Sequence, residues 1–173
     1  MTNALFVKNI KISVIFLALC FALPIAVPAG AQTDGREIDN VLAAAETFFA
    51  KLKAKEYRAV WELLTKKSQE TIVKDTYKSL AKTPSRSSRE EIAADFSRGG
   101  SIAGEYWQGY LSVFDPDLVL NQSAWSMGVL KKELAEINLL YKKAEKPAVL
   151  KMSRENGLWK VGLVETFWSR NPD

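Results

Sequence analysis

The sequence predicts an α+β domain in which N-terminal helices pack on an antiparallel sheet. Apolar residues recur with the period of a helix through residues 36–80, whereas they alternate with other residues through much of 135–167. Asn156-Gly157 stands between the last two runs of strand-forming residues and is the dipeptide most typical of a two-residue type I′ hairpin. Because the helices come first and the strands follow, they are expected to form two layers of one domain.

The first 31 residues have the features of a secretory signal peptide. Lysines precede a short apolar run at residues 12–23, and Ala29-Gly30-Ala31 places small residues at the cleavage positions. We expect cleavage after Ala31, a periplasmic or secreted mature chain of residues 32–173, and no stable membrane span after cleavage. The alternative is an uncleaved anchor, for which the apolar run is short.

Cleavage would remove the one cysteine, Cys20, and the sequence contains no histidine. The mature chain would have no disulfide, thiol nucleophile or thiolate ligand, so a packed core must stabilise it. Lys8 and Lys11 also precede the cleavage point, which leaves 22 basic and 20 acidic residues from Gln32 onward. So balanced a charge does not favour binding to nucleic acid or to a membrane.

Three successive periods of apolar residues predict three helices. The first period gives one apolar face over four turns: Ile38, Val41, Leu42, Ala45, Phe48, Phe49 and Leu52. The second consists of Tyr57, Val60, Trp61 and Leu64. The third consists of Ile72, Val73, Tyr77 and Leu80, and Ser68 is its expected N-cap. The lysines between these residues are expected to lie on solvated faces.

The segment that follows contains several turn signals. A loop is expected at 83–87, followed by a short helix that begins with a capping box, Ser88-Arg89-Glu90-Glu91, and ends at Gly99-Gly100. Residues 101–114 also fit a helical face, although two glycines weaken it. Asp115-Pro116-Asp117 is expected to form a turn.

The strands come last. Residues 123–131 are expected to form an edge strand or an irregular arm, and 135–141 form a clearer strand. The hairpin should pair 147–155 with 158–167 and set Arg154 opposite Trp159. One face of it is then apolar and should lie against the first helix: Leu150, Met152, Trp159, Val161 and Leu163.

Two segments of the chain resemble the NTF2-like superfamily. One is Ala44-Ala45-Glu46-Thr47-Phe48-Phe49, followed by Lys55-Glu56-Tyr57 and Trp61-Glu62-Leu63-Leu64; the other runs from Arg154 to Val161 with the sequence RENGLWKV. The resemblance covers most of residues 36–168, and its motifs are structural. It implies a cone in which a curved sheet wraps around a long helix with a pocket between them. The helical segment 66–100 is longer than a minimal member needs.

The candidate site follows from this implied pocket. The sequence has no phosphate-binding loop, metal-ligand spacing or nucleophile elbow, so no cofactor, metal or catalytic residue is assigned. We expect the mouth of the cone to be lined by some of Tyr106, Tyr110, Trp125 and Tyr141, with Glu165 within reach of the cavity. The hairpin register places Glu165 on the apolar face, although it would reach water if it lies at the end of the sheet. The aromatic residues are equally ordinary material for a core.

The leading hypothesis is an exported, non-catalytic NTF2-like domain that binds a small apolar ligand or a protein partner, including a second copy of itself. The competing hypothesis is an isomerase or dehydratase that uses carboxylates and tyrosines, as some NTF2-like enzymes do. A third is a structural or oligomerising module with a filled cone. An acid inside an open cone would distinguish the enzyme from the other two.

Overall fold

The structure is a computed structural model that describes residues 29–82 and 87–167. The expected signal segment falls almost entirely outside these ranges, so export stays a prediction. Among the described helices, none has both the length and the apolar character needed to cross a lipid bilayer.

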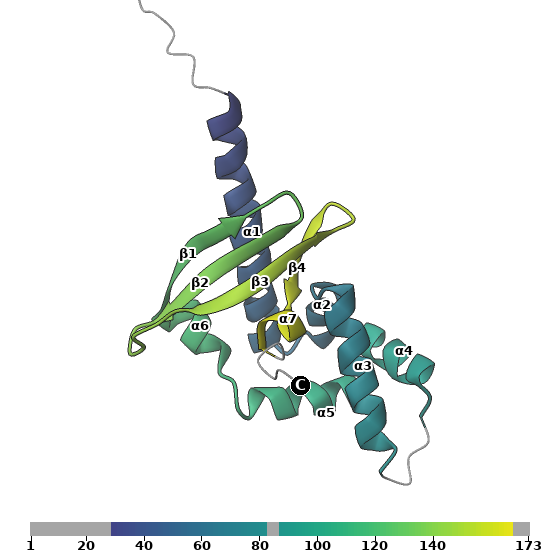
Figure 1. The fold of residues 1–173 in the computed structure, drawn as a ribbon. Coiled ribbons are helices and arrows are strands. Elements are labelled where there is room, and N and C mark those ends of the chain that lie inside the picture. Colours follow the sequence, from purple (N-terminus) through teal and green to yellow (C-terminus); the bar gives the residue numbers. More distant parts are fainter. Residues whose placement is uncertain (1–28, 83–86, 168–173) are drawn as a thin grey trace, which may run out of the picture.

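Helices make up the first two thirds of the described chain and a four-stranded antiparallel meander the last third, so the expected α+β class is confirmed. The helices are α1 (Ala29–Lys53), α2 (Tyr57–Glu62), α3 (Lys66–Leu80), α4 (Arg89–Arg98), α5 (Ser101–Leu111), α6 (Pro116–Gln122) and α7 (Leu163–Phe167). The strands are β1 (Ser123–Leu130), β2 (Leu134–Tyr141), β3 (Ala148–Glu155) and β4 (Leu158–Gly162), in that order across the sheet. In Figure 1, α1 passes behind the strands, and α3, α4 and α5 gather beyond the β4 edge.

The β3–β4 hairpin has the predicted turn and register. Asn156 and Gly157 have φ angles of +52° and +79°, the two left-handed conformations that a type I′ turn requires. Arg154 pairs with Trp159, and Met152 pairs with Val161. The five residues of the predicted apolar face are all buried.

The hairpin prediction was wrong beyond Gly162, where β4 ends and α7 begins. The amide N–H of Lys151 in β3 donates instead to Oγ1 of Thr166, at 2.9 Å. Helix α7 thus provides a hydrogen-bond acceptor for β3 just past the end of β4, and it buries Leu163 and Val164. The alternation of Leu163, Glu165 and Phe167 is too short to separate a strand from a single helical turn.

Two helix starts also differ from the prediction. The N-cap of α3 is Thr65, whose Oγ1 accepts from the N–H of Ser68, so Ser68 lies inside the first turn. Asp115 is the N-cap of α6 and not part of an isolated turn, since its side chain accepts from the N–H of Asp117. The capping box of Ser88 and Glu91 is confirmed.

The predicted core is confirmed. The eight residues expected to be buried together all belong to one buried cluster: Phe48, Phe49, Leu52, Trp61, Leu150, Trp159, Val161 and Leu163. A row of rings extends this cluster through the helical layer, with neighbouring centroids 4.7–5.7 Å apart: Trp61, Phe96, Tyr106, Trp107, Tyr110 and Phe114. Phe114 then stacks on Phe49 of α1 at 5.9 Å, so the aromatic row is continuous with the core beneath the sheet.

Candidate functional site

Two of the three tyrosines expected at the cone mouth belong to the aromatic row. Tyr106 and Tyr110 project from α5, and both rings contact Trp107 edge-on. Burial raises the pKa of both hydroxyls well above their ordinary value of 10.0, with smaller contributions from Asp75 at Tyr106 and from Tyr106 at Tyr110. Both hydroxyls therefore stay protonated to a higher pH than the hydroxyl of an exposed tyrosine.

The other two aromatic candidates lie in the sheet. The indole Nε1 of Trp125 in β1 donates to the carbonyl oxygen of Val119 at 2.8 Å, and the ring stands edge-on to Phe49. Tyr141 ends β2 and is half-buried. Trp125 thus packs against the same core as the α5 tyrosines.

Glu165 lies in α7 and points toward the start of α3. Its Oε1 lies 2.9 Å from Oγ1 of Thr65, and its Oε2 lies 2.8 Å from Oγ of Ser68. Both hydroxyl-bearing residues are fully buried. The Ser68 hydroxyl oxygen also accepts from the N–H of Val164, at 3.1 Å. Glu165 therefore joins α7 to the first turn of α3, and it lines none of the three pockets described below.

A groove of about 540 Å³ between α2, α3 and α4 is the largest of these pockets. Helix α3 supplies one wall with residues at the spacing of one helical face: Lys66, Gln69, Glu70, Val73 and Lys74. Trp61 of α2 and Arg89, Glu90 and Ala93 of α4 complete the lining. Because Trp61 and Val73 are buried and the charged residues are exposed, the groove has an apolar floor and a charged rim.

The connection between α2 and α3 holds this wall in place. The N–H of Thr65 donates to the carbonyl oxygen of Val161 in β4 at 3.0 Å, and the N–H of Val161 donates to Leu63 at 2.8 Å. Within the groove, the side-chain Nε2 of Gln69 donates to the carbonyl oxygen of Trp61 at 2.7 Å. The Trp61 ring packs on Phe96 with centroids 4.7 Å apart. The floor is thus attached to both the sheet and the aromatic row.

The charges of the groove are unevenly paired. Lys66 lies 3.8 Å from Glu70, and the Arg89 guanidinium lies over the ring of Tyr77 at 5.1 Å. Within the described part of the chain, Lys74 and Glu90 form no ion pair, and the indole Nε1 of Trp61 has no hydrogen-bond acceptor. Polar groups that can meet a ligand therefore surround an apolar floor.

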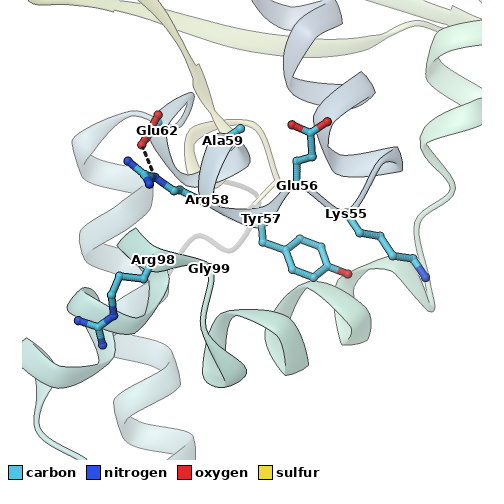
Figure 2. A pocket seen from close by; sticks show the side chains of 8 residues that line it. All are labelled: Lys55, Glu56, Tyr57, Arg58, Ala59, Glu62, Arg98 and Gly99. Atoms are coloured by element: carbon cyan, nitrogen blue, oxygen red, sulfur yellow. Dashed lines mark hydrogen bonds and ion pairs between the residues drawn. The ribbon is translucent and has the colours of Figure 1, made fainter.

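A second pocket of about 410 Å³ lies between the end of α1, the start of α2 and the end of α4. Figure 2 shows that its cations do not converge: Lys55 and Arg98 lie at opposite ends, and Arg58 turns toward Glu62. The Nε of Arg58 lies 3.1 Å from Oε1 of Glu62. This pocket therefore offers a ligand no group of cations that act together.

A third pocket of about 320 Å³ lies between α3 and α5 and includes Tyr106. Its other polar lining residues are Asp75, Thr76, Ser79 and Glu105. Within residues 29–82 and 87–167, no three side chains of the metal-binding types lie close enough to hold a metal ion.

The sequence interpretation missed the groove because it assigned the lysines of residues 66–80 to a solvated face. The one available signal was the spacing of Gln69, Val73 and Lys74 beside the apolar stripe of the same helix.

Comparisons with models of protein families, with curated proteins and with solved structures find no match to this chain.

Proposed function

We propose that the mature protein is an exported, non-catalytic domain of the NTF2-like type that binds a small ligand with an apolar body in the α2–α3–α4 groove. The observation that carries the proposal is the groove itself, whose apolar floor is surrounded by charged groups. Its volume of about 540 Å³ falls within the range of pockets that hold small organic ligands. The proposal places the ligand away from the five residues expected from the sequence.

The environment of Glu165 favours binding over catalysis. A general base needs a carboxylate that can reach a substrate proton. Both oxygens of Glu165 accept hydrogen bonds from buried hydroxyls instead, which gives the residue a structural role. An isomerase or dehydratase of the NTF2-like type remains the alternative, and turnover that depends on Glu165 would favour it.

Chemical-shift mapping on the chain from Gln32 onward tests the site, with 1-decanol as the apolar probe. We expect perturbed amide signals at Gln69, Val73 and Ala93. Perturbations confined to Tyr110 and Trp125 would favour the site expected from the sequence. If decanol and its charged analogues perturb no signal at all, the protein does not bind ligands of this class.

Filling the groove provides a second test. Ala93 is half-buried and lines the groove, so Ala93→Phe should occupy its floor and weaken decanol binding at least tenfold. Ala59→Phe is the matched control, because Ala59 is also a half-buried helical alanine but lines the pocket of Figure 2. Equal losses of affinity in both variants would contradict the proposed site.

A further inference from the structure

The two ends of the groove differ in charge. At one end, Lys66 pairs with Glu70, and the two charges cancel. Lys74 lies eight residues beyond Lys66 in α3, which is about 12 Å along the helix axis. Arg89 lies near Lys74, because its guanidinium contacts the ring of Tyr77, which follows Lys74 by three residues in α3. Lys66, Lys74 and Arg89 outnumber Glu70 and Glu90, so the lining carries a net charge of +1. Because Lys66 is paired with Glu70, this excess belongs to the end with Lys74 and Arg89.

The contact with Tyr77 leaves the edges of the Arg89 guanidinium open. The arginine lies over the ring at 5.1 Å, and no described carboxylate lies within ion-pair distance of it. A guanidinium held in this way can donate two parallel hydrogen bonds to a carboxylate. Lys74, which also lacks an ion pair in the described chain, adds a second positive charge. This end of the groove therefore suits a single anionic group.

The middle of the groove suits an apolar chain. Trp61 lies beside Gln69, which donates to its carbonyl oxygen and stands between Lys66 and Lys74 along α3. Val73 and Ala93 also line the groove, and the aliphatic part of Lys74 can lie along the same surface. Beyond them, the Lys66–Glu70 pair offers no unbalanced charge to a second ionic group. An apolar chain with one charged end matches this order of surfaces.

We infer that the ligand of the groove is a small amphipathic monocarboxylate, with its carboxylate at Lys74 and Arg89 and its apolar chain across Trp61 toward Lys66. This inference rests on the proposed function, because it specifies the chemistry of the ligand for the same groove. It excludes amines as ligands, since a cation would meet Lys74 and Arg89.

A series of three probes with the same ten-carbon chain tests the inference: decanoate, 1-decanol and decylammonium, each titrated calorimetrically below its micelle concentration. Decanoate should bind at least tenfold more tightly than decanol, and decylammonium more weakly than decanol. The advantage of decanoate should shrink as salt is added, because the groove is open to solvent. Equal affinity for decanoate and decanol would overturn the inference and leave the proposed function standing. If none of the three binds, the proposed function fails as well.

Variants then assign the effect to the two cations. The double variant Lys74→Gln, Arg89→Gln should lower the affinity for decanoate at least tenfold more than the affinity for decanol, so that the preference for decanoate is lost. Lys67→Gln is the matched control, because Lys67 is an exposed lysine of α3 outside the groove lining. Lys74→Glu should raise the affinity for decylammonium above that for decanoate. If the double variant and Lys74→Glu both keep the preference for decanoate, the carboxylate of the ligand binds elsewhere and the inference is overturned.

Discussion

The indole Nε1 of Trp159 donates a 2.7 Å hydrogen bond to Oε1 of Glu37, across 122 residues of sequence. Arg154 of the same hairpin places its Nη1 3.0 Å from that oxygen, and its guanidinium lies 5.9 Å from the centre of the Trp159 ring. One carboxylate of α1 is thus held by two side chains that the β3–β4 pairing sets opposite each other. Near the other end of α1, Lys53 pairs with Asp117 of α6 at 2.6 Å. The long helix is therefore attached to the rest of the fold at Glu37 and again at its C-terminal residue, Lys53.

A double-mutant cycle measures the first of these attachments. Trp159→Phe removes the donor and Glu37→Ala removes the acceptor, and we expect a coupling energy of about 1 kcal/mol in urea unfolding. Glu46→Ala serves as the control, because Glu46 is an exposed acid of α1 with no ion pair among the described residues. A coupling near zero would show that the bond does not contribute to stability.

Two residues with positive φ should respond in opposite ways to substitution. Gly157→Val should destabilise the protein by about 1 kcal/mol or more, because a β-branched residue resists the φ of +79°. Lys55 has a φ of +59° at the end of α1, where the N–H of Glu56 donates to Lys51 and that of Lys55 to Leu52. This is the hydrogen-bond pattern of a helix end that favours glycine. Lys55→Gly should therefore stabilise the protein by about 0.5–1 kcal/mol.

Thermal and urea unfolding of both variants check these signs. Ala50→Gly is the control for Lys55→Gly, because Ala50 is an exposed residue within α1, where glycine should cost about 1 kcal/mol. Loss of stability in Lys55→Gly would mean that the lysine side chain contributes more than its backbone conformation costs.

The raised pKa values of Tyr106 and Tyr110 predict a loss of stability in alkali. A tyrosine in the unfolded chain ionises near its ordinary pKa of 10.0, whereas these two stay protonated in the folded state above that pH. The stabilisation is therefore complete below about pH 10 and is lost as the pH rises toward the folded-state pKa values. The double variant Tyr106→Phe, Tyr110→Phe should flatten this dependence in urea unfolding. The prediction fails if all five tyrosines of the folded protein ionise together near pH 10.

Export predicts a mature chain that begins at Gln32. N-terminal sequencing of the protein recovered from the periplasm or the medium tests this directly. Ala31→Phe should block processing, because cleavage requires a small residue at that position. An N-terminus at Met1 would contradict the cleavage, and retention of the protein in the cytoplasm would contradict export itself.

Elements that depend on local chemistry were predictable from the sequence, and those that depend on distant partners were not. Asn156-Gly157 determines the hairpin register on its own, and Ser88 and Glu91 form a cap within four residues. Helix α7 was missed because its favourable contacts involve β3 and α3. The groove was missed for the same reason, since Trp61 and Ala93 become neighbours only when α2, α3 and α4 pack together.

Glu165 shows both what the sequence predicts and what it does not. Its alternation with apolar neighbours correctly indicated a position near the core, although the strand assignment behind that prediction was wrong. Its hydrogen-bonding partners, Thr65 and Ser68, lie 100 and 97 residues away. Nothing local to residue 165 identifies two hydroxyls at the start of another helix, so the same carboxylate could be taken from the sequence for a general base.

Glu165→Gln separates the structural role from the catalytic one. The amide keeps the volume of the carboxylate but replaces one charged acceptor with an NH₂ donor, so one of the two hydroxyls must change its hydrogen bond. We expect a destabilisation of about 1–3 kcal/mol in urea unfolding with the fold retained. Faster hydrogen exchange in the first turn of α3 should accompany it. Glu155→Gln is the control, because Glu155 accepts from the N–H of Lys66 in the same turn but is bonded to backbone alone among the described residues.

The same variant tests the enzyme alternative. If Glu165 is a catalytic base, its replacement by an amide should lower the turnover of an enolisable or dehydratable substrate by about 10²–10⁴-fold. If the carboxylate is structural, Glu165→Gln should change the free energy of unfolding, and the parent protein should show no turnover of such a substrate. Unchanged stability in Glu165→Gln together with lost turnover would make Glu165 the general base and overturn the binding proposal. A stability loss larger than that of Glu155→Gln, without any turnover in the parent protein, would instead confirm that the carboxylate holds α7 against α3, next to the wall of the groove.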